Sequence, residues 1–352
     1  MAPNKSFSIG ETVVKPGQRT NINLPVADLY TSTSLSMPVQ VICGRRDGPV
    51  LFVSAAIHGD ELNGVEIVRR LLRLKALRSI RGTLIAVPIV NVHGFLHQSR
   101  YLPDRRDLNR SFPGSAKGSI AARLAHTFFK EVVSKADYGI DLHTGAINRS
   151  NLPQIRGNLD DEKTLELANC FGVPVIINAN IRDNSLRASV SESGVPVLIY
   201  EAGEALRFDE MSIRAGLRGT LNVMRLIGML PAKKAAKRPV NPVLARSMSW
   251  VRAPASGIVN TIMKLGSSVS KGQRLATIND PLGDSSAMLV APFDGIIIGR
   301  SNLPLAHEGD ALFNIAEIKN VSKAEDLVEE FTTTLYDHTY TCLVTPLTEL
   351  NE

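Results

Sequence analysis

The stretch VLFVSAAIHGDELNGVEIVRRLLRL, residues 50–74, decides the fold class. Its first eight residues are apolar apart from Ser54, a pattern typical of a strand buried on both faces of a sheet. After the polar residues 58–61, apolar residues recur at helical spacing: Leu62, Val65, Val68, Leu71 and Leu72. A buried strand that leads directly into a helix indicates an α/β layer.

The alternation of strands and helices continues to about residue 229. We expect further strands at 83–91, 138–142, 173–179 and 195–203. We expect helices at 119–136, with Ser119 as a candidate N-cap, and at 162–171 and 209–229. Because parallel strands need crossover helices between them, this order predicts an α/β domain with a mixed, largely parallel sheet flanked by helices.

A change of composition marks the end of the α/β region. The stretch PAKKAAKRPVNPVLARS, residues 231–247, is rich in proline and basic residues and predicts an exposed linker. Beyond it, APASGIV (253–259) is echoed by APFDGII (291–297), and VSKGQRLATI (269–278) is echoed by AHEGDALFNI (306–315). Two such halves, each a strand, a turn and a strand, predict a small all-β barrel.

These features divide the chain into three regions. Residues 1–240 are expected to form the α/β domain, with the linker at about 231–247, and residues 248–318 the barrel-like domain. Residues 319–352 form a tail with a helical segment, AEDLVEEF at 324–331, and we assign this tail no role.

The composition excludes several classes of protein. A hydrophobic fraction of 44% with 21% charged residues is that of a soluble globular chain. No apolar run approaches the roughly 20 residues that span a bilayer, and the start lacks the apolar core of a signal peptide. The three cysteines, Cys43, Cys170 and Cys342, form no CxxC pair, which favours a reducing cytoplasm over a disulfide framework.

The formal net charge of +6 raises the question of nucleic-acid binding. The densest basic run, KKAAKR at 233–238, falls in the predicted linker and has no aromatic residues interleaved for base stacking. An anionic small substrate explains a mild basic excess as well, so we expect neither a nucleic-acid nor a membrane partner.

Three residues at predicted strand ends have the chemistry of metal ligands. His58 and Glu61 lie at i and i+3, so both can reach one ion if the turn is helical, although they also suit a polar helix start. His143 follows a buried strand, where a core histidine is the alternative. Together they form a His₂Glu set with an open position, the pattern of catalytic zinc. Manganese or cobalt can replace zinc with such ligands.

Two further clusters suit substrate binding and proton transfer. In DLNRSFPG (107–114), Asn109 and Arg110 can bind a carboxylate, and a turn with a solvated arginine is the alternative. Glu201 ends a strand, where a carboxylate beside a metal can act as general base. A strand-end acid paired with a basic side chain is the alternative, and Glu204 is the rival for the role.

HGDE, DLNRSFPG, DLHTG and a strand-end glutamate occur in this order between about residues 50 and 205. This pattern resembles the succinylglutamate desuccinylase/aspartoacylase family of the zinc carboxypeptidase-like superfamily. The resemblance implies a zinc-carboxypeptidase-like fold in which the domain at 1–240 is catalytic. It also implies one Zn²⁺ per chain, held by His58, Glu61 and His143.

The resemblance extends to the residues around the metal. It implies that Glu201 is the general base and acid and that Asn109 and Arg110 bind the substrate carboxylate. It gives Asp107 the role of orienting the first zinc histidine, since a ligating imidazole usually donates its other N–H to a carboxylate. An arginine upstream should stabilise the oxyanion: Arg100 is our choice, with Arg105 and Arg106 as alternatives. Arg149 and Arg156 are candidates to contact a second substrate carboxylate.

The implied activity is zinc-dependent hydrolysis of an N-acyl amino acid, of the N-acetyl or N-succinyl type, to a carboxylate and a free amino acid. A metallocarboxypeptidase that acts on a short peptide is the first alternative, and a catalytically silent metal- or ligand-binding protein is the second. The C-terminal repeat resembles a biotinyl/lipoyl-type barrel, but its central hairpin tip, NDPLGDSSAM at 279–288, has no carrier lysine. We therefore expect a structural role for it, and the sequence leaves a homo-oligomer open.

Overall fold

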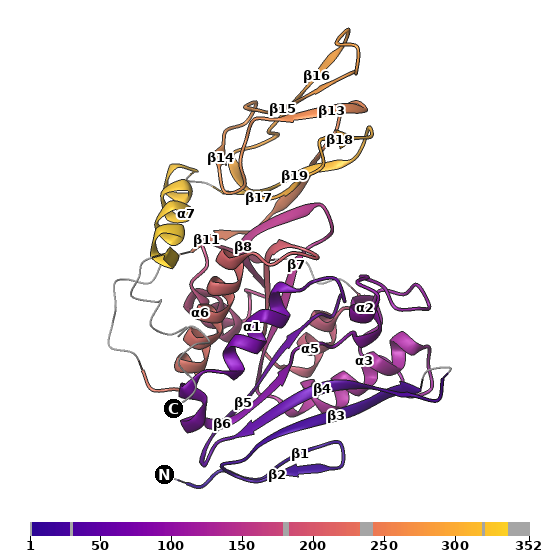
Figure 1. Cartoon of the computed structure of the whole chain (residues 1–352). Helices are drawn as coiled ribbons and strands as arrows, with labels where there is room; N and C mark the ends of the chain where they lie inside the picture. Colours follow the sequence, from indigo (N-terminus) through magenta and orange to yellow (C-terminus); the bar gives the residue numbers. More distant parts are fainter. Residues whose placement is uncertain (1, 29–30, 179–182, 233–241, 319–320, 337–352) are drawn as a thin grey trace, which may run out of the picture.

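The computed structural model describes residues 2–28, 31–178, 183–232, 242–318 and 321–336, with 321–324 and 336 as backbone alone. A central mixed sheet has helices on both faces, and further antiparallel strands extend from one end of it (Figure 1). None of the helices in these ranges is long and apolar enough to cross a membrane.

Four parallel strands form the centre of the main sheet, in the order β6, β5, β7 and β10. Their bounds are Arg46–Ala55 (β5), Arg81–Val87 (β6), Tyr138–Gly145 (β7) and Val197–Glu204 (β10). Antiparallel strands continue the sheet beyond β6: β4 (Ser34–Cys43) and β3 (Arg19–Asp28). The predicted mixed sheet with a parallel centre is therefore present.

On the other side of β10, the sheet continues through four antiparallel strands. In order they are β8 (Arg149–Gly157), β17 (Gly295–Ser301), β19 (Ala311–Glu317) and β12 (Met248–Arg252). Two short strands lie beside β8: β9 (Val175–Asn178) pairs with it in parallel, and β11 (Val243–Ala245) pairs with β9.

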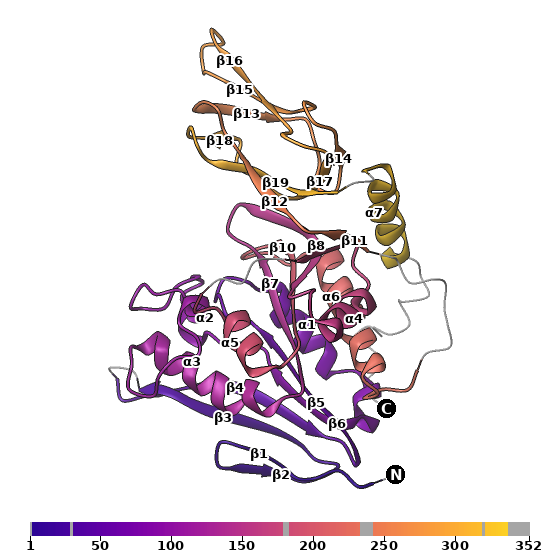
Figure 2. The same ribbon diagram turned by 180° about the vertical axis from the view of Figure 1, so that it is seen from behind.

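Helices cover the two faces of the sheet (Figure 2). One face carries α1 (Asn63–Leu72), α4 (Glu162–Phe171) and α6 (Glu210–Leu226). The other carries α2 (Val92–Leu96), α3 (Ile120–Glu131), α5 (Leu186–Ser193) and the hairpin of β1 (Phe7–Ile9) and β2 (Thr12–Val14). Short 3₁₀ helices occupy Lys75–Ser79, Leu108–Arg110 and Val133–Lys135.

The apolar run of β5 separates the two cores by strand alternation. Leu51, Val53 and Ala55 point to one face and pack under α1 and α6. Phe52 points the other way, where its ring meets Phe128 of α3 edge-on at 6.1 Å. A strand buried on both faces needs nearly continuous hydrophobicity, which is why residues 50–57 predicted the layer.

The predicted helices and strands of this region are present, and α4 has the predicted bounds. Ser119 caps α3 as expected, because its hydroxyl accepts a hydrogen bond from the Ala122 amide at 3.3 Å. The sequence analysis did not predict β3, β4, β8 or α5.

The C-terminal strands follow the internal repeat. A second sheet contains β16 (Ser286–Val290), β15 (Arg274–Asn279), β13 (Gly257–Thr261) and β18 (Leu305–Ala306), and β14 (Ser268–Val269) pairs with β17. The two halves pair reciprocally, since β13 of the first half pairs with β18 and β14 pairs with β17 of the second. These strands enclose a core of their own.

The predicted domain boundaries stay predictions, because β17 also hydrogen-bonds to β8 and makes the two regions share a sheet. The predicted helical segment at 324–331 lies within α7 (Val321–Tyr336). Residues 233–241 of the predicted linker, and the tail from 337 onward with Cys342, lie outside the described residues.

Candidate active site

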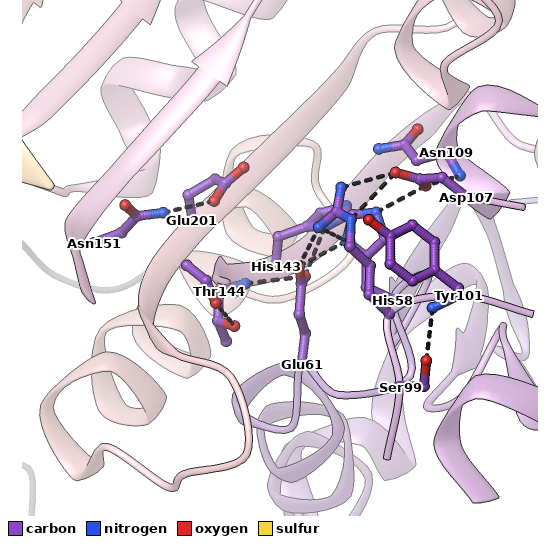
Figure 3. A network of polar contacts seen from close by, with 12 residues as sticks. His58, Glu61, Ser99, Tyr101, Asp107, Asn109, His143, Thr144, Asn151 and Glu201 are labelled. Atoms are coloured by element: carbon purple, nitrogen blue, oxygen red, sulfur yellow. Dashed lines mark hydrogen bonds and ion pairs between the residues drawn. The ribbon is translucent and has the colours of Figure 1, made fainter. Parts of the chain in front are cut away.

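His58, Glu61 and His143 converge in the core of the molecule. Their ligand-type atoms lie within 4.8 Å of one another, and all three residues are buried. Glu61 lies between the imidazoles: Oε1 is 2.6 Å from Nδ1 of His58, and Oε2 is 2.8 Å from Nδ1 of His143 (Figure 3). Two nitrogen atoms and a carboxylate that face one point form a donor set suited to zinc.

The turn that carries His58 and Glu61 is not helical, unlike the geometry that we considered from the sequence. Both residues lie between β5 and α1, which begins only at Asn63. A hydrogen bond of 3.1 Å from the Glu61 amide to the His58 carbonyl closes the turn. The two side chains meet because the turn folds back, not because they share a helix face.

A carboxylate orients the outer nitrogen of each histidine. Nε2 of His58 lies 3.2 Å from Asp107, the residue that the family resemblance singled out. Nε2 of His143 lies 2.7 Å from Asp141, which the sequence analysis missed. Asp141 and His143 are two residues apart on β7, so their side chains share a face, and that spacing could have revealed the pair. Both histidines thus present Nδ1 toward the common point.

The charges in this cluster shift one another's pKa values. Burial on its own raises the pKa of Glu61, but the two imidazoles outweigh it and hold that pKa well below its usual range. Burial lowers the pKa of His143, but the carboxylates of Asp141 and Glu61 outweigh it and raise that pKa well above its usual value. A metal ligand must be deprotonated, so metal binding to this cluster should release protons.

Arg100 reaches the edge of this cluster. Nη2 and Nε of Arg100 donate to Asp107 at 3.0 and 3.2 Å, and Nη1 lies 3.5 Å from Glu61. The two alternatives for the oxyanion role, Arg105 and Arg106, are exposed and do not line the pocket over the cluster. A guanidinium beside the open side of the cluster can stabilise negative charge that develops there.

Glu201 lies opposite His143 in the sheet, because the two residues are direct partners in the parallel pairing of β10 with β7. Asn151 of β8 donates a hydrogen bond to Glu201 at 2.8 Å, and Arg156 of β8 lies 3.9 Å from its other oxygen. Glu204 lies farther along β10, where its oxygens accept from the Asn148 amide and the Asn302 side chain, each at 2.9 Å. Glu201 lines the pocket, and Glu204 does not.

The loop that contains Asn109 and Arg110 forms the other side of the site. Asp107 caps the short 3₁₀ helix by accepting from the Asn109 amide at 2.8 Å. The Asn109 side-chain oxygen accepts from the Leu186 amide at 3.0 Å, and within the described part of the chain its NH₂ group makes no hydrogen bond and can donate to another partner. Figure 3 shows Asn109 and Asp107 on one side of the cluster and Glu201 with Asn151 on the other.

A pocket of about 200 Å³ opens above the cluster. Its lining includes all the predicted site residues except Asp107, which lies behind His58. It also includes residues that the sequence analysis missed: Asn151, Ser185, Arg187 and Trp250. Trp250 comes from β12, about a hundred residues after His143 in the chain, and no local sequence signal connects the two.

Comparisons with known proteins agree with this geometry. The family model for the succinylglutamate desuccinylase/aspartoacylase catalytic domain matches residues 47–227, and the chain belongs to this family. The chain is 25% identical to the N-alpha-acetyl-L-2,4-diaminobutyric acid deacetylase of Halomonas elongata over 311 residues. This match covers 84% of this chain and 90% of that protein. The chain is 24% identical over 213 residues to the succinylglutamate desuccinylase of Pseudomonas aeruginosa, 56% of this chain and 63% of that protein.

A solved structure shares the fold. The ectoine utilization protein EutE (DoeB) from Ruegeria pomeroyi superimposes with a TM-score of 0.77 at 23% identity, covering 85% of this chain and 95% of that one. The named relatives are deacylases of N-acyl amino acids, and this family relationship supports an amidohydrolase.

Proposed function

We propose that the protein is a zinc-dependent hydrolase that cleaves the amide bond of an N-acyl amino acid, of the N-acetyl or N-succinyl type. The observation that carries the proposal is the pairing of Glu201 with His143 across adjacent strands. It places a carboxylate beside a buried His₂Glu set, on the wall of the same pocket. Such a set with an open position is typical of catalytic rather than structural zinc.

Each proposed ligand fits the metal by its surroundings as well as by its type. The donor set contains no sulfur, and Asp107 and Asp141 fix the orientation of the two imidazoles. Bound there, zinc would polarise the acyl carbonyl and lower the pKa of a water molecule.

The chain's own residues would do the rest of the reaction. Asn109 and Arg110 hold the substrate carboxylate and orient the amide. Glu201, held by Asn151, takes a proton from the attacking water and later delivers it to the departing amine. Arg100 donates hydrogen bonds to the oxygen that becomes negative. Water and one amide are consumed, and a carboxylic acid and a free amine are formed.

The partner that we propose is therefore a small N-acyl amino acid. The deacetylase of Halomonas elongata makes N-acetylated amino acids the first substrates to examine. A cytoplasmic location is part of the same proposal, and Cys43 and Cys170, the cysteines that the structure describes, are both free thiols.

The test is amine release from a panel of N-acetyl and N-succinyl amino acids and several dipeptides, each with and without a metal chelator. We expect chelator-sensitive release from at least one N-acyl amino acid. Release from dipeptides alone would assign the protein to the metallocarboxypeptidases. No release from the zinc-loaded protein would overturn the proposal in favour of a binding protein.

A further inference from the structure

The C-terminal strands contribute a side chain to the pocket. Trp250 of β12 is half-buried and lines the pocket together with the residues around Glu201. Its ring lies under the guanidinium of Arg149, with 5.1 Å between Cζ and the ring centroid, a cation–π contact. Arg149 begins β8, so this contact joins the first α/β region to the C-terminal strands.

The register of four strands explains why Trp250 reaches the site. Trp250 pairs with Asn314 of β19, Asn314 with Gly299 of β17, and Gly299 with Asn151 of β8. Residues that pair directly in a sheet point to the same face. Trp250 therefore lies on the face of the sheet that carries Asn151 and, two residues earlier on β8, Arg149.

Gly299, which has no side chain, leaves space for its neighbours Asn314 and Asn151 on this face of the sheet. A Cβ atom at this position would lie 3.0 Å from Oδ1 of Asn151 and 3.3 Å from Cβ of Asn314, both tighter than ordinary contact. The absence of a side chain lets Asn151 turn its amide toward Glu201, at 2.8 Å, next to the Arg149 and Trp250 pair.

Arg149 has donors to offer to a ligand. It forms no ion pair within the part of the chain that the structure describes, whereas Arg100 is paired with Asp107 and Arg156 lies 3.9 Å from Glu201. Stacking on an indole occupies the face of a guanidinium and leaves its in-plane N–H groups directed outward, as bidentate binding of a carboxylate requires.

The balance of charge in the pocket also favours an anion. Five arginines line it, against the carboxylates of Glu61 and Glu201, and Glu61 belongs to the candidate metal set. Arg149 and Arg156 both belong to β8, whereas Asn109 and Arg110 come from the loop on the other side of the cluster. The pocket thus has two separate groups of cationic donors.

We propose that Trp250 is a positioning residue that holds Arg149 in place to bind a second anionic group of the substrate on the β8 side of the pocket. That this anionic group belongs to a substrate rests on the proposed deacylase function. Binding of the anion can be tested separately from catalysis. The C-terminal strands then belong to the site itself.

Trp250 is the only tryptophan in the chain, so its fluorescence reports the state of the pocket directly. The zinc-loaded protein is titrated with succinate, and with acetate for comparison. We expect a saturable change of emission with succinate, and an apparent Kd that rises about tenfold or more in Arg149→Gln, because a charge-assisted contact is lost. Arg274→Gln is the matched control, because Arg274 is an exposed arginine of β15 outside the pocket.

Trp250 itself is tested by kinetics on matched substrates that differ by one charge: N-acetyl-aspartate with N-acetyl-asparagine, and N-succinyl-glycine with N-acetyl-glycine. For the dianionic member of at least one pair, Trp250→Ala should raise KM about two- to fivefold with little change in kcat. Trp250→Phe should keep KM near the original value, since it retains an aromatic face.

The outcomes separate the two proposals. Equal changes for both members of each pair, or no change in Trp250→Ala, would overturn the positioning role and leave the deacylase intact. Succinate binding that is absent, or is unaffected by Arg149→Gln, would overturn the anion site. Failure to hydrolyse any substrate, with succinate binding that still depends on Arg149, would remove the deacylase proposal alone.

Discussion

Asp141 accepts a hydrogen bond of 2.7 Å from Nε2 of His143, two residues farther along the same strand. Both side chains are buried, and the second oxygen of Asp141 accepts from the Ser54 hydroxyl at 2.7 Å. In the neutral imidazole, this buried chain from Ser54 through Asp141 would keep the proton on Nε2 and leave the lone pair of Nδ1 for a metal. One of the proposed ligands is thereby prepared for a metal by residues that never touch it.

The first prediction concerns this orienting carboxylate. Asp141→Asn removes the charge but keeps the size, and we expect the Kd for zinc to rise about 10- to 100-fold. Competition with a chromophoric chelator measures the change. Asp137→Asn, an exposed position next to the same strand, should leave the affinity unaltered. Equal zinc affinity in the Asp141 variant would show that the hydrogen bond has no part in metal binding.

The second prediction concerns a ligand directly. His143→Ala leaves two of three proposed protein ligands, so the purified protein should contain little zinc by elemental analysis. The control is His307→Ala, an exposed histidine of the C-terminal region. Full zinc occupancy in the His143 variant would show that the metal binds elsewhere.

The third prediction separates the two glutamates of β10. Glu201→Gln should retain zinc and lose at least about two orders of magnitude in kcat, because the amide cannot accept the proton. Glu204→Gln should keep the rate, since Glu204 is held by Asn148 and Asn302 outside the pocket. If the losses are reversed, Glu204 is the base.

The fourth prediction concerns stability and pH. Hydrogen bonds from Arg69 and Arg70 lower the pKa of Glu66 from 4.5 to about 2. A carboxylate with a lowered pKa in the folded state stabilises that state fully above its unfolded value of 4.5, and the stabilisation is lost as the pH falls toward about 2.

Glu66→Gln should therefore lower the free energy of unfolding at pH 7 by about 1 to 2 kcal/mol. The difference from the original protein should shrink as the pH drops below 4.5. Urea unfolding at a series of pH values measures both quantities, with Glu11→Gln, at an exposed site, as the control. A difference that stays constant down to pH 3 would show that Glu66 acts through packing alone.

The sequence predicts elements best where burial leaves a clear pattern. Residues 50–57 are apolar apart from Ser54 because this part of β5 is enclosed on both faces, and the helix at 162–171 has a cap at Asp161 and a glycine stop at Gly172. Strand β8 gives no such signal: it contains Asn151, Pro153 and Gln154, all buried. Its position is fixed by pairing with β10, β17 and β9, which are distant in sequence.

The same distinction applies to the site. Motif order points to His58, Glu61 and His143: the first two follow β5, and His143 lies near the C-terminal end of β7, so all three meet at the same edge of the parallel strands. The sequence analysis placed His143 after its strand, whereas β7 extends through it to Gly145. The structure brings these side chains together, and their roles remain the proposal made above. Arg187 and Trp250 escape prediction because they enter the pocket through α5 and β12, elements that lie beside the site only after the whole sheet has formed.

The continuation of the main sheet into the C-terminal strands has a consequence for the integrity of the fold. β17 covers the open edge of β8 at Arg149–Asn151, and β11 covers the outer edge of β9. A chain shortened after α6 would expose both edges, with unpaired N–H and C=O groups ready to pair with another molecule. We expect such a fragment to aggregate instead of folding as a smaller enzyme. For the same reason, insertions and deletions should be tolerated within the distal β15–β16 hairpin, which covers neither edge, but not at the junction of β17 with β8.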